Sequence, residues 1–163
     1  MRIEQLTEQR LQEAINLVDM VFPEQGDEPA RIVFSASLNP EKYKEYLMKH
    51  QILPDLRYWL AIDELGEVRG IIGLYRYEKD KEEAFWGGWF CVDPRKKGIG
   101  LQLGRFAINE ARRRGKAFLR LWTTTSLDEL RAHKLYDKSE FKLVGEEPFG
   151  NTGLMKLFYE LKL

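Results

Sequence analysis

Three cationic residues run directly into two glycines in the middle of this sequence. Arg95, Lys96 and Lys97 are followed by Gly98 and Gly100, and an apolar pattern with helical spacing begins immediately afterwards. The N-terminus of a helix has unpaired N–H groups and a partial positive charge, and together they bind phosphate well. Glycine lets the backbone approach an anion closely, and the cations add full charges beside it. The stretch therefore indicates a phosphate-binding turn, with a solvated basic loop before a helix as the competing interpretation.

Two other phosphate-binding motifs fit this stretch less well. A P-loop requires Lys followed by Ser or Thr after its glycines, whereas Leu101 and Gln102 follow the last glycine here. A dinucleotide-binding fingerprint would place its third glycine at position 103, where the sequence has Leu103. The turn therefore matches neither motif.

The residues around the turn alternate between strand and helix periods. Strands are expected over residues 2–6, 58–62, 68–77, 84–92, 117–124, 141–146 and 154–161. Helices are expected over residues 7–20, from 39–41 through 47, over 98–114, and over 126–139 after a capping box of Ser126 and Glu129. Pro23 and Pro29 interrupt residues 22–38, where no regular element is predicted. This order predicts a single α/β domain over residues 1–163, with a mixed sheet.

Composition limits the classes of protein to which the chain can belong. The formal net charge is zero, which argues against nucleic acid or a membrane as the main partner. Cys91 is the single cysteine, which excludes an intramolecular disulfide and suits a reducing compartment. The charged start lacks the apolar core of a signal peptide, and no apolar run approaches the roughly 20 residues of a membrane span. We therefore expect a soluble, cytoplasmic protein.

The basic turn resembles the pyrophosphate-binding signature of the GNAT superfamily of acyl-CoA-dependent N-acetyltransferases. In that family the pattern Arg95-x-x-Gly98-x-Gly100 stands between a strand, here ending at Cys91-Val92, and a long helix. The segment between the strand and the signature is about two residues shorter here than in the usual family form. The resemblance implies that the turn binds the diphosphate of coenzyme A.

A second motif resembles the same family. Residues 132–136 (AHKLY) with the downstream Phe141 are similar to the family's second helix motif, which carries a tyrosine and a later Gly-Phe pair. Glu140 stands where the family usually has that glycine. The likeness extends over most of the chain from about Tyr58 onward, and the order of the elements agrees. It implies a mixed, mostly antiparallel β-sheet flanked by helices.

The resemblance also implies an activity and a set of contacts. In the expected reaction, a primary amine of a small molecule or peptide directly attacks the acetyl group of acetyl-CoA, the cosubstrate. No metal is expected, and the resemblance is compatible with a homodimer. The pantetheine arm would bind the backbone beside Gly87-Gly88, a pair that by itself suggests a bulge or a close backbone approach. The residues expected to contact the cosubstrate are Phe90, Cys91, Val92, Arg95, Lys96, Lys97, Gly98, Ile99, Gly100, Leu101 and Thr125.

Tyr136 is the expected proton donor to the leaving thiolate, and a half-buried aromatic that anchors the helix is its ordinary alternative. The general base stays open between Glu82, Glu83, His133 and a relay of water molecules. Cys91 has no histidine near it in sequence, and a lone strand cysteine is usually a small buried hydrophobe, so covalent catalysis is not expected.

The acceptor site is expected between residues 22–57 and the central strands, where aromatic side chains gather. These are Tyr43, Tyr46, Trp59, Tyr75, Trp86 and Trp89. Aromatic walls suit a cationic or aromatic amine, and they suit a packed core equally well. Two other functions remain as alternatives: a non-catalytic acyl-CoA-binding or regulatory module on the same fold, and a nucleotide-binding protein that uses the glycine turn for ATP or NAD.

Overall fold

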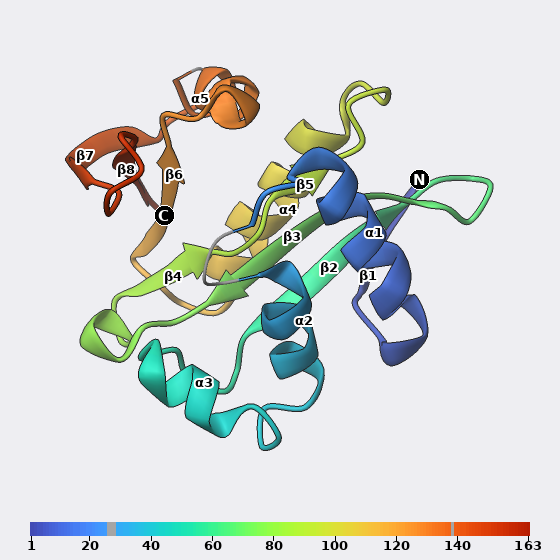
Figure 1. The fold of residues 1–163 in the computed structure, drawn as a ribbon, viewed down its shortest axis with the longest axis horizontal. Coiled ribbons are helices and arrows are strands. Elements are labelled where there is room, and N and C mark those ends of the chain that lie inside the picture. Colours follow the sequence, from blue (N-terminus) through green and yellow to red (C-terminus); the bar gives the residue numbers. More distant parts are fainter. Residues whose placement is uncertain (26–28, 138) are drawn as a thin grey trace.

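The computed structural model describes residues 1–25, 29–137 and 139–163 (Figure 1). Within these residues an eight-stranded sheet has the spatial order β1-β2-β3-β4-β6-β8-β7, and β5 pairs with β3 beyond the end of β4. The strands are β1 (Arg2–Gln5), β2 (Arg57–Ile62), β3 (Val68–Tyr75), β4 (Ala84–Gly87), β5 (Cys91–Val92), β6 (Phe118–Thr124), β7 (Lys142–Pro148) and β8 (Met155–Lys162). The α-helices are α1 (Leu11–Val21), α2 (Ala30–Leu38), α3 (Lys44–Lys49), α4 (Ile99–Arg113) and α5 (Leu130–Asp137). Short 3-10 helices cover Glu8–Arg10, Glu78–Asp80 and Leu127–Glu129.

Strand pairing is mixed and mostly antiparallel, which confirms the predicted fold class. Among the described strands, β4 and β6 are the only parallel neighbours, and every other pair is antiparallel. Parallel neighbours need a crossover connection, and α4 lies in the connection between β5 and β6. The helix that follows the basic turn is therefore the link between the two halves of the sheet.

Helices cover both faces of the sheet because the strands point successive side chains to opposite sides. On the front face, Leu60 and Ile71 pack in one apolar cluster with residues of α1 and α2. On the rear face, Ala61 and Ile72 pack in a second cluster with residues of α4. Figure 1 shows α1 and α2 in front of the central strands and α4 behind them. The buried residues of α4 recur every fourth position: Ile99, Leu103, Ala107 and Ala111.

Two local expectations about helices were wrong. Helix α2 lies in the segment for which no element was predicted, because it begins directly after Pro29 and buries Val33 and Phe34 against the front face. Ser126 precedes the 3-10 helix at Leu127–Glu129 without a capping hydrogen bond from its side chain, so the predicted capping box is absent. Both differences come from contacts with the sheet, which local sequence patterns do not report.

The predicted strand over residues 84–92 is interrupted between β4 and β5. Trp86 and Trp89 both pack in the front-face cluster, whereas an unbroken strand would send residues three apart to opposite faces. The backbone therefore bulges at residues 88–90, as the two adjacent glycines predicted. A side chain on Gly88 would have a Cβ only 2.5 Å from the Tyr58 hydroxyl, so the backbone also approaches its neighbour closely there.

The bulge separates the two halves of the sheet. Pairing between β4 and β6 ends at Trp86 and Arg120. Beyond that point, residues 121–124 of β6 pair only with β8 among the described strands, and β5 pairs only with β3. We call the gap between residues 88–92 and residues 121–124 the opening. No helix in the described part of the chain is long and apolar enough to cross a membrane.

Candidate functional site

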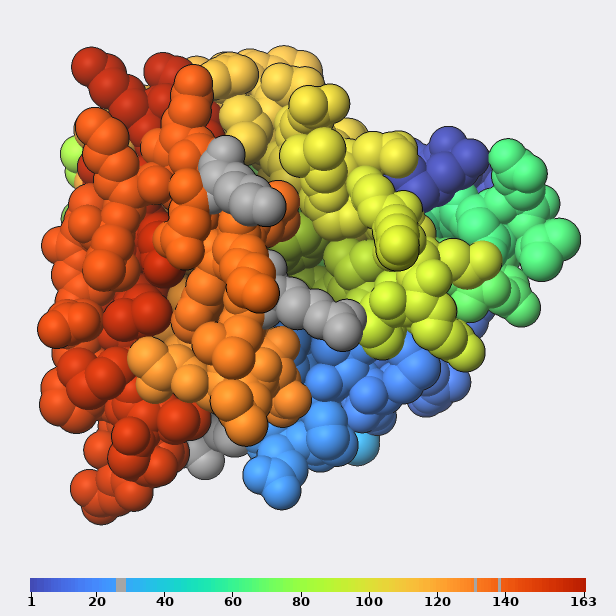
Figure 2. All heavy atoms as spheres, turned by 90° about the horizontal axis from the view of Figure 1, so that it is seen from above, coloured from blue at the N-terminus to red at the C-terminus, as the bar shows by residue number. Residues whose placement is uncertain are grey.

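The start of α4 and helix α5 lie on the two sides of the opening. Figure 2 shows α5 in orange and the segment that leads into α4 in yellow, facing each other across a hollow. Phe90 connects these two sides, because its ring packs against both the rear-face cluster around Ile99 and a third cluster that contains Tyr136. The basic turn and the tyrosine motif are therefore neighbours in space, about 40 residues apart in sequence.

The backbone at the start of α4 presents unpaired N–H groups. Gly98 immediately precedes the helix in the left-handed region, with φ of 84° and ψ of −15°. Among the described residues, no acceptor is bonded to the amides of Gly98, Ile99 or Gly100. The amide of Lys96, by contrast, already donates to the Asp93 carbonyl at 3.0 Å. The amides of the glycine turn and of the first residues of α4 are thus free, as an anion site at a helix N-terminus requires.

Space beside these amides is open. A Cβ added at Gly98 would meet no heavy atom within 4 Å. A Cβ added at Gly100 would lie 3.5 Å from Phe90 Cζ and 3.6 Å from Val92 Cγ2. The first turn of α4 therefore borders the side chains of the bulge and β5, and Lys96, Lys97 and Leu101 are exposed around it.

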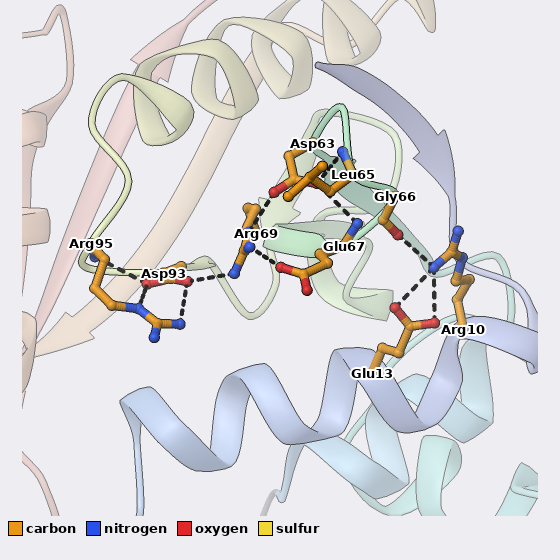
Figure 3. A network of polar contacts seen from close by, with 9 residues as sticks. All are labelled: Arg10, Glu13, Asp63, Leu65, Gly66, Glu67, Arg69, Asp93 and Arg95. Carbon is orange, nitrogen blue, oxygen red and sulfur yellow. Dashed lines mark hydrogen bonds and ion pairs between the residues drawn. The ribbon is translucent and has the colours of Figure 1, made fainter.

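The Arg95 guanidinium forms an ion pair with the carboxylate of Asp93 (Figure 3). Its Nε and NH2 groups donate to the two carboxylate oxygens of Asp93 at 2.9 and 2.8 Å, and its backbone amide donates to Oδ1 at 3.0 Å. Asp93 is only 1% exposed, and the hydrogen bonds from Arg95 hold the pKa of this carboxyl well below its usual range. Arg95, an expected phosphate ligand, thus pairs with Asp93 within the turn, while its side chain remains 69% exposed.

Arg69 connects this turn to the β2–β3 hairpin. Its NH1 group lies 3.2 Å from Asp93 Oδ2, and its Nε donates to Asp63 Oδ2 at 2.7 Å. A further ion pair joins Arg69 to Glu67 (Figure 3). Two surface loops that are separate in sequence are therefore held together by one guanidinium, which Asp93 anchors from the side of the basic turn.

Cys91 and Val92 supply backbone groups at the edge of the opening. The Cys91 thiol is buried and donates to the Leu17 carbonyl at 3.8 Å. Burial, together with the charge of Asp93, raises the pKa of this thiol to about 12, so it stays protonated and is a poor nucleophile. This agrees with the expectation that Cys91 takes no covalent part in the reaction.

Tyr136 lies beside the opening, in a cluster with Leu121 and Tyr159. It is 8% exposed, and its ring centroid lies 5.3 Å from that of Tyr159 and 5.8 Å from that of Phe141. Burial, and to a smaller extent the charge of Glu129, raises its pKa above the ordinary phenol value. Among the described residues no hydrogen-bond partner reaches its hydroxyl, and the raised pKa keeps this group protonated near neutral pH.

The end of β6 is tied to the helix motif and to β8. Glu129 accepts from the Thr124 amide and from the Thr123 hydroxyl, which replaces the predicted capping role. The His133 ring nitrogen Nε2 lies 3.3 Å from the Thr123 hydroxyl. Thr125, an expected cosubstrate contact, is exposed, and its hydroxyl accepts from the Met155 amide at 2.9 Å, so its first role here is to join β6 to β8.

The other candidate bases stand away from the opening. Glu82 and Glu83 precede β4, and Glu83 is four residues, or about 13 Å of extended strand, from Gly87. The Glu83 carboxylate lies 3.3 Å from Arg120, with half of its side chain exposed. Of the side chains considered as bases, His133 is the one connected to the free half of β6.

The expected aromatic wall divides between the two faces. Tyr43, Tyr46, Tyr75, Trp86 and Trp89 belong to the front-face cluster, as the acceptor hypothesis requires. Trp59 was wrongly included, because it packs on the rear face with its ring 5.3 Å from Phe106. Trp122 and Phe158 were not among the expected residues, and they extend the front-face aromatic surface onto β6 and β8. Their isolated positions in two separate strands gave no signal that they would meet.

An open, mostly antiparallel sheet that separates beside a helix N-terminus is the architecture of acyl-CoA-dependent N-acyltransferases. The chain belongs to the acetyltransferase (GNAT) family, whose family model matches residues 20–141. The protein is therefore an acyltransferase.

Solved structures of this family share the fold over almost the whole chain. A putative GNAT-family acetyltransferase from Desulfovibrio desulfuricans is 14% identical, with a TM-score of 0.76 over 99% of this chain and 98% of that one. An aminoglycoside 6'-N-acetyltransferase complexed with coenzyme A is 17% identical, with a TM-score of 0.73 over 99% and 97% of the two chains. A ribosomal-protein-alanine N-acetyltransferase from Brucella melitensis is 20% identical, with a TM-score of 0.70 over the full length of both. No curated protein sequence is a significant match. At these identities the likeness shows the fold.

Proposed function

We propose that this acetyltransferase moves an acetyl group from acetyl-CoA to a primary amine by direct attack of the amine. The single observation that carries the proposal is the meeting of three features at the opening. They are the free amides at the start of α4, the unpaired edges of β5 and β6, and the protonated hydroxyl of Tyr136. A diphosphate, an amide-rich arm and a thioester occur in this order along acetyl-CoA, so the three features suit its parts.

The residues at the start of α4 fit a diphosphate. The amides of Gly98, Ile99 and Gly100 would donate to the phosphate oxygens, and the exposed Lys96 and Lys97 would add charge. Because Asp93 already neutralises Arg95, we assign Arg95 to holding the turn in shape and the two lysines to attracting the anion.

The edges of the opening fit the pantetheine arm. β5 pairs with β3 along one edge, and its other edge, continued by Phe90, presents backbone N–H and C=O groups to the opening. An extended ligand can pair with such an edge as an added strand does. We assign the backbone of Phe90, Cys91 and Val92 to this pairing, and Leu101 to the exposed rim of the phosphate site.

Acetyl-CoA supplies the acetyl thioester, and the protein has to manage the charges that its cleavage creates. An amine with a pKa of about 10.4 is neutral in only about one molecule in two thousand at pH 7, which costs about 4–5 kcal/mol unless the site or a base helps. A leaving thiolate with a pKa near 8.5 is a weaker base than a tyrosinate whose pKa is raised. We therefore assign to Tyr136 a hydrogen bond that stabilises the thiolate as its charge develops.

The proton of the amine leaves through water or through His133. Glu82 and Glu83 are not assigned as bases because they lie at the far end of β4. The pH–rate profile of a His133→Gln variant distinguishes the two routes. A general base works only in its unprotonated form, so the loss of rate toward acidic pH that it causes disappears in the variant if the histidine is the base, and the profile keeps its shape if water is.

The direct experiment is a screen of amines with detection of the free thiol released from acetyl-CoA. The proposal predicts thiol release that depends on an amine, together with coenzyme A binding that ATP and NAD do not displace. A non-catalytic acyl-CoA-binding module would bind coenzyme A and release no thiol with any amine. A nucleotide-binding protein would bind ATP or NAD in preference to coenzyme A, and either result would refute the proposal.

A further inference from the structure

One carboxylate on the front face has an oxygen without a partner. Asp80 Oδ2 accepts from Trp86 Nε1 at 2.9 Å and from Arg120 NH1 at 2.8 Å. Asp80 Oδ1 is buried, and no hydrogen-bond donor among the described residues reaches it. The Asp80 side chain is 9% exposed. A buried carboxylate oxygen with no donor is costly, so this atom calls for a donor from outside the chain.

The charges around Asp80 favour a cation as that donor. Arg120 is paired with Asp80, with Glu160 at 2.8 Å and with Glu83 at 3.3 Å, so one guanidinium is shared by three carboxylates. The group therefore carries a net charge of −2 in its ordinary ionisation state. An ammonium group that approached Asp80 would supply both the missing hydrogen bond and a neutralising charge.

An aromatic surface beside Asp80 already holds an ammonium group. Lys79 Nζ lies 5.2 Å from the centroid of the Trp86 ring and 5.4 Å from that of Tyr77. The two rings pack edge to face, with an interplanar angle of 74° and centroids 5.1 Å apart. Aromatic faces attract cations, and Lys79 is an exposed residue whose flexible side chain can swing away. The chain's own lysine thus shows what kind of group this surface accepts.

The location suits an acceptor of the transferase. Trp86 is the last residue of β4 that pairs with β6, directly before the opening. It faces the front of the sheet, opposite the rear-face clusters that contain α4 and Tyr136. An acceptor whose reacting amine enters the opening from the front would bring the rest of its chain past Trp86 and Asp80.

We propose that Asp80 and Trp86 bind a second ammonium group of the acceptor, so that the preferred substrates are amines with at least two cationic groups. This inference rests on the proposed function, and it names the class of acceptor. The ligand ammonium takes the place of the Lys79 ammonium over the rings and donates to Asp80 Oδ1. Lys79 consequently competes with the ammonium group of the substrate, and Asp80 is the residue that binds this group.

Matched amines and matched variants test this site. Linear α,ω-diamines of increasing length are compared with linear monoamines of the same length, using thiol release in the wild type. Asp80→Asn keeps the shape of the side chain and removes its charge. Glu83→Gln is the matched control, because it removes the charge of a half-exposed carboxylate that pairs with the same Arg120 guanidinium. Lys79→Met removes the competing ammonium.

The proposal predicts opposite effects for two of these variants. Asp80→Asn should lower the diamine-to-monoamine ratio of kcat/KM about tenfold or more, as the loss of a charged hydrogen bond does. Lys79→Met should raise the ratio, and Glu83→Gln should change it less than threefold, as expected for an exposed pair. A wild type that does not prefer diamines, or an Asp80→Asn variant with an unchanged ratio, would overturn the proposal. So would a Lys79→Met variant that moves the ratio in the same direction as Asp80→Asn.

A binding measurement separates this inference from the proposed function. Calorimetry with coenzyme A first establishes that each variant is folded and holds the cosubstrate. The complex is then titrated with the best diamine. If no amine releases thiol, but the diamine binds the wild-type complex and not Asp80→Asn, the proposed function fails and the cation site stands. If the diamine binds neither, or both equally, the cation site is refuted.

Discussion

Valine at position 98 tests the role of the glycine turn. Gly98 has φ of 84°, a region that a β-branched residue hardly adopts, and its Cβ would meet no heavy atom within 4 Å. The cost is therefore one of backbone conformation, about 1–3 kcal/mol. The chain relieves this strain by rotating the backbone, which turns the amides at the start of α4 away from their common direction. Each charged hydrogen bond lost to phosphate weakens binding by about 1.5–3 kcal/mol, so coenzyme A affinity should fall at least tenfold.

Gly66 provides a matched control for this variant. It lies in the β2–β3 turn with φ of 81°, and its Cβ would also meet no heavy atom within 4 Å. Gly66→Val should therefore lose about as much stability in urea unfolding as Gly98→Val. In calorimetric titration with coenzyme A, Gly66→Val should bind with nearly wild-type affinity, whereas Gly98→Val should bind more weakly. Equal affinities in the two variants would refute the assignment of the Gly98 turn to the diphosphate.

Three further outcomes follow from the geometry. Tyr136→Phe should lower kcat by roughly 10–1000-fold with little change in coenzyme A affinity, whereas its ring neighbour Tyr159→Phe should leave kcat within a few fold. The hydrogen bonds from its partners lower the pKa of Asp93, so this carboxylate stabilises the fold above about pH 4 and loses the contribution as the pH falls. In urea unfolding, the difference in stability between wild type and Asp93→Asn should therefore be full at pH 7 and shrink below about pH 4. Gly104→Ala, inside α4 with no atom within 4 Å of its Cβ, should raise the free energy of unfolding by about 0.5–1 kcal/mol. An unchanged kcat, a stability difference that does not depend on pH, or a loss of stability would contradict them in turn.

The strands and the long helix were predictable because their signals are local. Short apolar runs on either side of the Gly66 turn define the β2–β3 hairpin, and apolar residues at every fourth position define α4. The interruption after β4 was also predictable, since two adjacent glycines weaken a strand at that point. Helix α2 was not, because nine residues after a proline form a helix only where the front face of the sheet buries one side of it.

The charged and aromatic side chains of the site were less predictable than its backbone. Arg95 was expected to bind phosphate, and Asp93, two residues earlier, holds it in the folded chain. Glu129 matched a capping box, and the end of β6 binds it instead. Asp80 drew no attention because its partners Trp86 and Arg120 come from different strands. Backbone features follow from local sequence, whereas these side-chain partners are set by strand register and by which strands are neighbours.

The most direct test of the account is a titration of ¹⁵N-labelled protein with coenzyme A, followed through the backbone amide resonances. The resonances of the Gly98, Ile99 and Gly100 amides should shift strongly, because these amides donate to the diphosphate. Pantetheine, which lacks the diphosphate, should leave these three resonances in place while it shifts those of Phe90 and Val92. If coenzyme A leaves the three helix amides unmoved, or if pantetheine moves them equally, the start of α4 is not the diphosphate site.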